Sequence, residues 1–131
     1  MNLTAFIRSS LLCLAAVLIS HAVGAHHSTA MFDWGKERVI EGTVDSWQWT
    51  QPHTFIWLNV KGKGGKAEQW GLEGMSPSWL GRHGWDKRSL KSGDKVKVAI
   101  YPLRDGRTGG FAVRVTFADG HVLEQLPQRR G

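Results

Sequence analysis

Short runs of alternating apolar and polar residues follow one another along most of this chain, and they restrict its fold more than any other feature. In residues 95–101 (KVKVAIY) the valines and Ile100 are predicted to face a core, whereas the lysines and Ala99 face outward. Alternation with a period of two is typical of a strand with one buried face. Comparable runs occupy residues 39–44, 55–61, 68–73, 111–117 and 121–126. The pattern therefore predicts five strands and a short sixth.

One segment between the third and fourth strands has the signals of a short helix instead. Ser76 is a good N-cap, Pro77 suits the first helical position, and Gly84 is a natural stop. The order β-β-β-α-β-β matches the oligonucleotide/oligosaccharide-binding (OB) barrel. We therefore predict an all-β fold, a small OB-like antiparallel barrel of five to six strands with one short helix between strands three and four. Another small six-stranded barrel or sandwich is the alternative.

The first strand contains an irregularity. Ile40 and Val44 share one parity, whereas Trp47 and Trp49 fall on the other. A β-bulge near residues 45–46 accounts for this slip, because a bulge inserts one extra residue and bends the strand. We therefore expect a long, bent first strand.

The first 25 residues have the features of a secretory signal peptide. Arg8 gives a positive start, residues 11–19 (LLCLAAVLI) form an apolar run, and Val23 and Ala25 are the small residues before the cleavage site. The run is shorter than the roughly 20 residues that span a bilayer. We expect cleavage after Ala25, no transmembrane segment afterwards, and a location in the periplasm or outside the cell. An uncleaved N-terminal anchor is the alternative.

The predicted mature chain, residues 26–131, is one OB-like domain with an N-terminal arm at 26–38 and a flexible tail at 127–131. The arm is expected to pack through Met31, Phe32 and Trp34. Cys13, the only cysteine, lies in the signal peptide. The mature chain therefore has no disulfide, no thiolate metal ligand and no Cys-x-x-Cys-His site for haem attachment.

The net charge and the absence of known catalytic motifs restrict the classes of function that the chain can have. The net charge is +6, with 17 Lys and Arg against 11 Asp and Glu. This excess favours peripheral contact with anionic surfaces, or serves solubility alone. No Gly-x-Ser-x-Gly, His-Glu-x-x-His or phosphate loop occurs. The acids Glu41, Asp45, Glu68 and Glu73 are isolated on alternating positions, as on a solvated face. The sequence favours binding over catalysis.

Three histidines are candidate metal ligands: His26, His27 and His53. After cleavage behind Ala25, the α-amine and ring Nδ1 of His26 would chelate a metal, and an imidazole from His53 would add a third nitrogen. Three nitrogens suit Cu(II), so copper is the expected cofactor if there is one. Cleavage after Gly24 would instead make His27 the third residue of a copper-binding terminal tripeptide. The plainer interpretations are a solvated arm, and a His53 that only stabilises its turn.

Four aromatic residues are candidates for ligand binding, namely Trp47, Trp49, Phe55 and Trp57. They cluster in sequence across the first two strands, which in OB barrels lie beside the usual ligand face. Exposed rings there would stack on a sugar or an apolar partner. Alternatively, these rings cover the core or bury the arm. The lysines nearby also fit a single-strand nucleic-acid platform, but export argues against nucleic acid as the partner.

The chain resembles a family of small exported bacterial proteins of unknown function. The shared motifs are Ala25-His26-His27-Ser28, Phe32-Asp33, Gly42-Thr43-Val44, Trp70-Gly71-Leu72-Glu73, Leu80-Gly81-Arg82-His83-Gly84-Trp85 and Gly93-Asp94. The chain departs at Gln51, where the family pattern has Asn before Pro-His. The resemblance implies an exported single domain and no particular activity.

Together these observations predict an exported binding module whose ligand is unknown. One hypothesis is that this module binds copper at its mature N-terminus. The alternative is a cofactor-free interaction or structural protein of the cell envelope that uses the aromatic face. In either case the partner is a small ligand or an envelope component. A copper-dependent oxidative enzyme is a third hypothesis.

Overall fold

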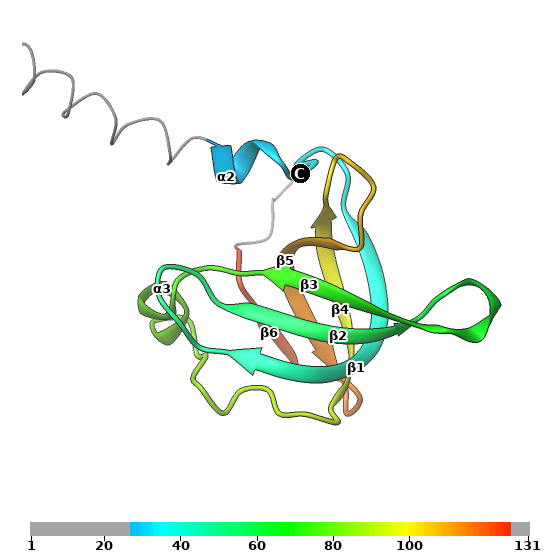
Figure 1. Cartoon of the computed structure of the whole chain (residues 1–131). Helices are drawn as coiled ribbons and strands as arrows, with labels where there is room; N and C mark the ends of the chain where they lie inside the picture. Colours follow the sequence, from blue (N-terminus) through cyan, green and yellow to red (C-terminus); the bar gives the residue numbers. More distant parts are fainter. Residues whose placement is uncertain (1–26, 127–131) are drawn as a thin grey trace, which may run out of the picture. The chain divides into compact units, whose positions relative to one another are not determined.

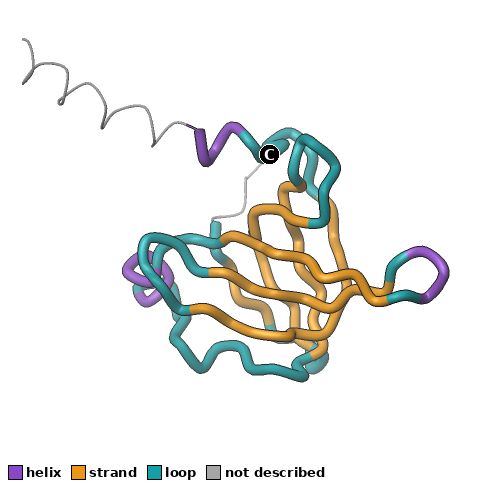
Figure 2. Tube along the Cα trace, viewed as in Figure 1, coloured by secondary structure: helices purple, strands orange, loops and turns teal. Residues whose placement is uncertain are grey.

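The computed structural model describes residues 27–126 of the chain. The chain forms two compact units, Met1–Met31 and Phe32–Gly131. The described part of the first unit contains one short helix, α2 (His27–Ala30). The second unit is a small β-barrel with one short helix (Figures 1 and 2). The predicted signal peptide and the predicted C-terminal tail lie outside the described residues.

The barrel is built from six strands in one sheet. Their bounds are β1 Arg38–Gln48, β2 Phe55–Lys61, β3 Ala67–Glu73, β4 Lys95–Pro102, β5 Gly109–Phe117 and β6 Val122–Glu124. The spatial order is β3-β2-β1-β4-β5-β6, and a further parallel pairing of β3 with β5 closes the first five strands into a ring. All other pairs are antiparallel. The predicted fold class, a small all-β OB-like barrel, is confirmed, although the parallel β3–β5 pair makes the barrel mixed and not wholly antiparallel.

The β-bulge predicted in the first strand is present. The register of β1 against β2 shifts between Val44 and Ser46, whose partners Leu58 and Trp57 are consecutive residues. Val44 therefore points into the barrel, and after the bulge Trp47 lies opposite the fully buried Ile56. The bulge turns the end of β1 so that its tryptophans also face inward.

Apolar residues form two clusters, one on each side of the sheet. The barrel core lies inside and includes Ile56, Leu58, Leu72, Val98 and Ile100. The second, which we call the N-terminal cluster, lies on the outside of β4 and β5 and consists of Phe32, Ala99, Tyr101, Phe111 and Val113, with Trp34 packed against it.

The N-terminal cluster corrects one expectation. Ala99 is buried rather than facing solvent, because the chain before β1 covers that side of β4. Phe32 pairs with Leu103 and stacks edge-on against Phe111, with ring centroids 5.6 Å apart. Met31, which was expected to pack with Phe32 and Trp34, is 39% exposed.

The predicted helix is α3 (Pro77–Gly81), between β3 and β4. Ser76 caps it, because its side-chain oxygen accepts a hydrogen bond from the Trp79 backbone N–H at 3.2 Å. The indole N–H of Trp79 donates to the Gln125 carbonyl at 3.0 Å, and that of Trp85 donates to the Glu124 carbonyl at 2.9 Å. These bonds attach α3 and the segment after it to the end of β6. A short 3-10 turn, η1 (Lys63–Gly65), joins β2 to β3.

Within residues 27–126, no helix is long and apolar enough to cross a membrane.

Candidate functional site

The four aromatic residues singled out in the sequence fall into two groups on opposite sides of the sheet. Trp47 and Trp49 pack against the barrel core, and the Trp47 ring lies 5.7 Å from that of the buried Trp85. Phe55 and Trp57 lie on the outside of β2, with their rings 6.3 Å apart and inclined by only 20°. Only the second pair is therefore available as an outward-facing stacking surface.

Gly71 on β3 determines how Trp57 lies. The two residues are partners across the β2–β3 ladder. A Cβ atom at Gly71 would come within 2.8 Å of Trp57 Cζ3 and 3.0 Å of Cη2. The six-membered part of the indole thus rests directly on the glycine backbone. The absence of a side chain at Gly71 lets the ring lie low against the sheet.

Polar side chains stand at one end of this aromatic pair. Asn59 and Gln69 are partners across β2 and β3, and each donates its amide N–H to a different carboxylate oxygen of Asp45, at 3.5 Å in both cases. All three residues are exposed. The bulge in β1 brings Asp45 toward these amides, which sequence spacing alone does not reveal.

At the other end His53 and Glu73 form a pair. His53 Nδ1 contacts Glu73 Oε1, and the side chains are 41% and 14% exposed respectively. Glu73 lies opposite Phe55 across the β2–β3 ladder, so this pair borders the aromatic rings directly. The sequence pattern predicts that Glu73 lies on a solvated face, but in the structure its side chain is mostly buried beside His53. Only the strand register brings the two together.

The loop that carries His53 is fixed from beneath. Thr54 is fully buried and donates through Oγ1 to the Met75 carbonyl at 2.9 Å. The Met75 backbone N–H donates to Oε1 of the buried Gln125, also at 2.9 Å. Between them Gly74 leaves no room for a side chain, since a Cβ would lie 2.4 Å from Gln125 Oε1. This packing sets the relative position of His53 and Glu73.

We use the name outer face for the surface formed by these residues. It comprises Phe55, Trp57 and Gly71 in the middle, Asp45, Asn59 and Gln69 at one end, and His53 and Glu73 at the other.

The predicted histidine ligands are not equally described. His26 lies outside the described residues, and for His27 the structure describes only its backbone at the start of α2. His53 is described fully, on the outer face. Among residues 27–126, no group of three or more His, Asp, Glu or Cys side chains is arranged to hold a metal ion.

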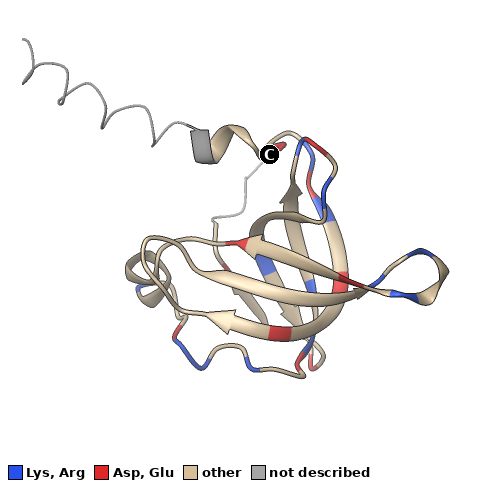
Figure 3. Cartoon of the chain, viewed as in Figure 1, with Lys and Arg blue, Asp and Glu red and all other residues tan. Residues whose placement is uncertain are grey.

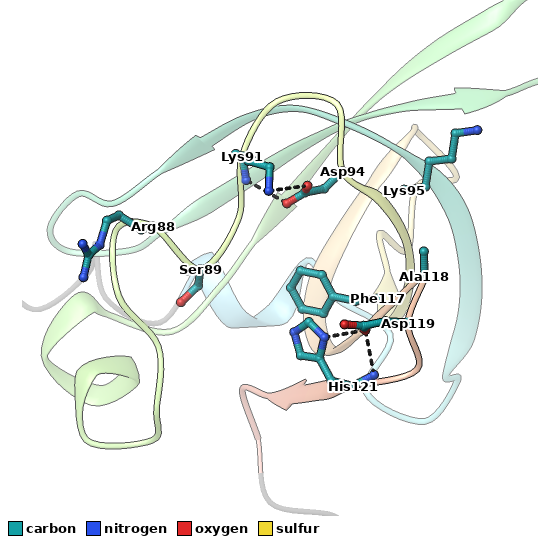
Figure 4. Close-up of a pocket in the computed structure, with 9 residues that line it drawn as sticks. All are labelled: Arg88, Ser89, Lys91, Asp94, Lys95, Phe117, Ala118, Asp119 and His121. Carbon is teal, nitrogen blue, oxygen red and sulfur yellow. Dashed lines mark hydrogen bonds and ion pairs between the residues drawn. The ribbon is translucent and has the colours of Figure 1, made fainter.

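A concave site separate from the outer face lies at the turn between β5 and β6 (Figure 4). It is a hollow of about 360 Å³ that includes Lys91, Asp94, Phe117 and His121 in its lining. The His121 ring stacks on Phe117 with centroids 3.9 Å apart. The sequence showed no more here than an exposed histidine beside a tight turn.

The carboxylates in this hollow are already paired with their neighbours. Asp119 accepts hydrogen bonds from the backbone N–H and from the ring of His121. These two bonds, the backbone bond more than the ring bond, hold the pKa of the Asp119 carboxyl below its ordinary value. Asp94 lies 3.5 Å from Lys91 Nζ, and the Lys91 side chain is 84% exposed. These local pairs account for the arrangement, so we assign the hollow no ligand.

Charged residues of both signs are distributed over the loops and the strands (Figure 3). Basic residues are gathered at the end of β2 and in the loop that follows it, where Lys61 ends the strand and Lys63 and Lys66 lie in the loop. The outer face itself contributes carboxylates from Asp45 and Glu73, and its described residues include no lysine or arginine. The positive charge of this region is therefore concentrated beyond Asn59, at the border of the outer face, and not beside the aromatic rings.

The fold and the site define a small, closed, OB-like barrel with an aromatic and polar outer face. The chain belongs to a family described as Family of unknown function (DUF6152), whose model matches residues 14–112. The match confirms the predicted membership in a family of unknown function. No curated protein and no solved structure matches the chain.

Proposed function

We propose that this protein is an exported ligand-binding module and that the outer face is its binding surface. The observation that carries this proposal is the near-parallel pair of Phe55 and Trp57 on the outside of the barrel, bordered at both ends by polar side chains. Aromatic rings that do not contribute to a core offer a large contact area for a ligand. The strands β2 and β3 are also the usual ligand face of OB barrels. The signal-like residues 1–25 support export to the periplasm or beyond.

A fragment screen by NMR tests the location of the site. The protein, isotope-labelled and purified after export from a Gram-negative host, is exposed to a panel of small sugars, peptides and aromatic compounds. We expect the shifted resonances to concentrate on Trp57, Gly71 and Asn59, and Trp57→Ala to abolish them. Shifts concentrated on His121 and Phe117 instead would contradict the proposal. Mass spectrometry of the same sample identifies the mature N-terminus, and a retained signal peptide would contradict export.

We also propose a copper site that includes His53, because of the contact between this histidine and Glu73. Metal-binding histidines commonly donate one ring N–H to a carboxylate, which orients the ring and leaves the other nitrogen for the metal. Glu73 at Nδ1 would leave Nε2 of the half-exposed His53 free for this purpose. In the processed protein, His26 would add its amine and ring, or His27 its ring after cleavage at Gly24.

The length of the N-terminal segment is compatible with this copper site. Phe32 packs on Phe111, and Phe111 is the partner of Glu73 across the parallel β3–β5 pair. Phe32 is thus fixed against the strand next to the one that carries Glu73. Phe32 is six positions after His26, and an extended chain spans roughly 3.3 Å per residue, or about 20 Å over this length.

Copper titration of the exported protein tests this second proposal. We expect Glu73→Gln to weaken Cu(II) binding at least tenfold, since carboxylates behind a ligating histidine contribute about 10- to 100-fold in affinity. His53→Ala removes the ligand itself and should weaken binding further. His121→Ala is the matched control and should bind copper as the wild type does. Binding that is insensitive to His53→Ala would remove this residue from the site. A mature terminus beyond His27 would exclude the terminal chelate.

A cofactor-free interaction protein of the cell envelope remains the alternative function. It would use the same Phe55 and Trp57 surface, with an envelope protein as the partner. In the fragment screen this alternative predicts that apolar peptides, and not sugars, give the shifts on the outer face.

A further inference from the structure

We infer that the ligand of the outer face is an uncharged oligosaccharide chain. This inference depends on the proposed function, because it names the ligand class of the same surface. Three features of the outer face support it: the shape of its aromatic pair, the chemistry of the polar groups at its ends, and the sign of its charge.

The aromatic pair provides a continuous apolar surface along β2. Phe55 and Trp57 are two residues apart on one strand, and their ring planes differ by only 20°. Gly71 allows the Trp57 ring to rest on the backbone of β3. Sugar rings carry C–H groups on their faces, and such faces stack on aromatic rings. Two rings in succession suit two successive units of a chain better than one compact ligand.

The groups at both ends of the pair match the hydroxyl groups of sugars. Asn59 and Gln69 each carry an amide that both donates and accepts hydrogen bonds, and Asp45 accepts only. Because Asn59 and Gln69 reach Asp45 at 3.5 Å, at the limit of a hydrogen bond, these contacts are weak and readily exchanged for ligand hydroxyls. At the opposite end, Glu73 accepts and the exposed ring of His53 adds a further polar group.

The charge of the outer face disfavours the other polymers that stack on aromatic rings. Single-stranded nucleic acids need cations along the groove that holds their phosphates. Here the charged groups next to the rings are the carboxylates of Asp45 and Glu73. The nearest lysine, Lys61, lies at the far end of β2, and Lys63 and Lys66 follow in the loop to β3. An anionic polysaccharide would meet the same repulsion. An uncharged chain does not.

Isothermal titration with cellohexaose and with N-acetylated chitohexaose tests the inference on the exported protein. We expect at least one of them to bind, and Trp57→Ala to weaken that binding at least tenfold. Phe55→Ala should weaken it several-fold. Gly71→Ala retains both rings but displaces Trp57, so it should also weaken binding several-fold. His121→Ala, which removes another stacked ring, should bind the sugar as the wild type does. Amide NMR spectra of each variant verify that the barrel is folded.

The outcomes separate this inference from the proposal on which it depends. If neither oligosaccharide binds while other fragments shift Trp57 and Gly71, the sugar inference is wrong and the outer face remains a binding surface. If the fragments bind elsewhere, both are wrong. If a thymidine oligonucleotide or an envelope protein binds at Trp57 more tightly than either oligosaccharide, the sugar inference is wrong and that class of partner takes its place. Sugar binding that is unchanged in Trp57→Ala would also overturn the inference.

Discussion

Replacing Trp85 with alanine should lower the free energy of unfolding by about 4 kcal/mol, within the range found for large aromatic residues in cores. Trp85 is 2% exposed and belongs to the barrel core. Its ring lies 5.7 Å from that of Trp47, and its indole N–H donates to the Glu124 carbonyl at 2.9 Å. The substitution would therefore leave a large cavity and remove the attachment between β6 and the segment after α3.

Urea denaturation at 25 °C, followed by circular dichroism, measures this loss. Trp57→Ala is the matched control, since it removes the same side chain from the outer face, where we expect a loss of at most about 1 kcal/mol because substitutions outside the core have small effects. Equal losses in the two variants would show that Trp57 is as important to the fold as Trp85, and would remove the main argument for a binding role.

Gly74→Ala is the second substitution with a large expected effect, a loss of about 3 kcal/mol, at the upper end of the range for overpacking a closed interior. A Cβ at this position would lie 2.4 Å from Gln125 Oε1 and 2.6 Å from Thr54 Oγ1. Both of these side chains are buried and engaged in hydrogen bonds to Met75, so neither can move without leaving a polar group unpaired. Since Thr54 and Gly74 follow His53 and Glu73 directly, the change should also disturb that pair.

Thermal and urea denaturation of Gly74→Ala measure the loss, with Gly81→Ala as the control. Gly81 ends α3, and a Cβ there would meet no atom within 4 Å. Alanine favours a helix over glycine by about 1 kcal/mol, so the control should be neutral or stabilising. If Gly74→Ala were as stable as Gly81→Ala, the packing between Thr54 and Gln125 would have to be looser than the structure indicates. NMR signals of the His53 ring would report any displacement of the pair.

The sequence was sufficient to predict the barrel because each strand has its own alternating pattern. Even the bulge in β1 followed from a local observation, the change in parity between Val44 and Trp47. The N-terminal cluster was only partly predicted. Residues such as Ala99 and Val113 alternate as strand residues do, but no local pattern shows that Phe32 and Trp34 will cover them from outside.

The outer face was harder to predict, since its residues come from three strands. Tryptophan is equally compatible with a core and with a stacking surface, so the sequence grouped Trp47 with Trp57. The bulge then placed them on opposite sides of the sheet. Glu73 and Asp45 looked isolated because their partners are distant in sequence: His53 lies in the loop before β2, and Asn59 and Gln69 lie on β2 and β3. These pairings depend on the β2–β3 register and on the bulge. Gly71 has no sequence signal of its own.

The two indole hydrogen bonds to β6 have a consequence for self-association. A strand at the border of a sheet is a template on which another chain can add by backbone pairing, and proteins protect such borders with short strands or with covering segments. Here β6 has three residues, and the carbonyls of Glu124 and Gln125 already accept from Trp85 and Trp79. An approaching chain would find these acceptors taken. The same tryptophans that complete the core therefore also protect this border against strand addition.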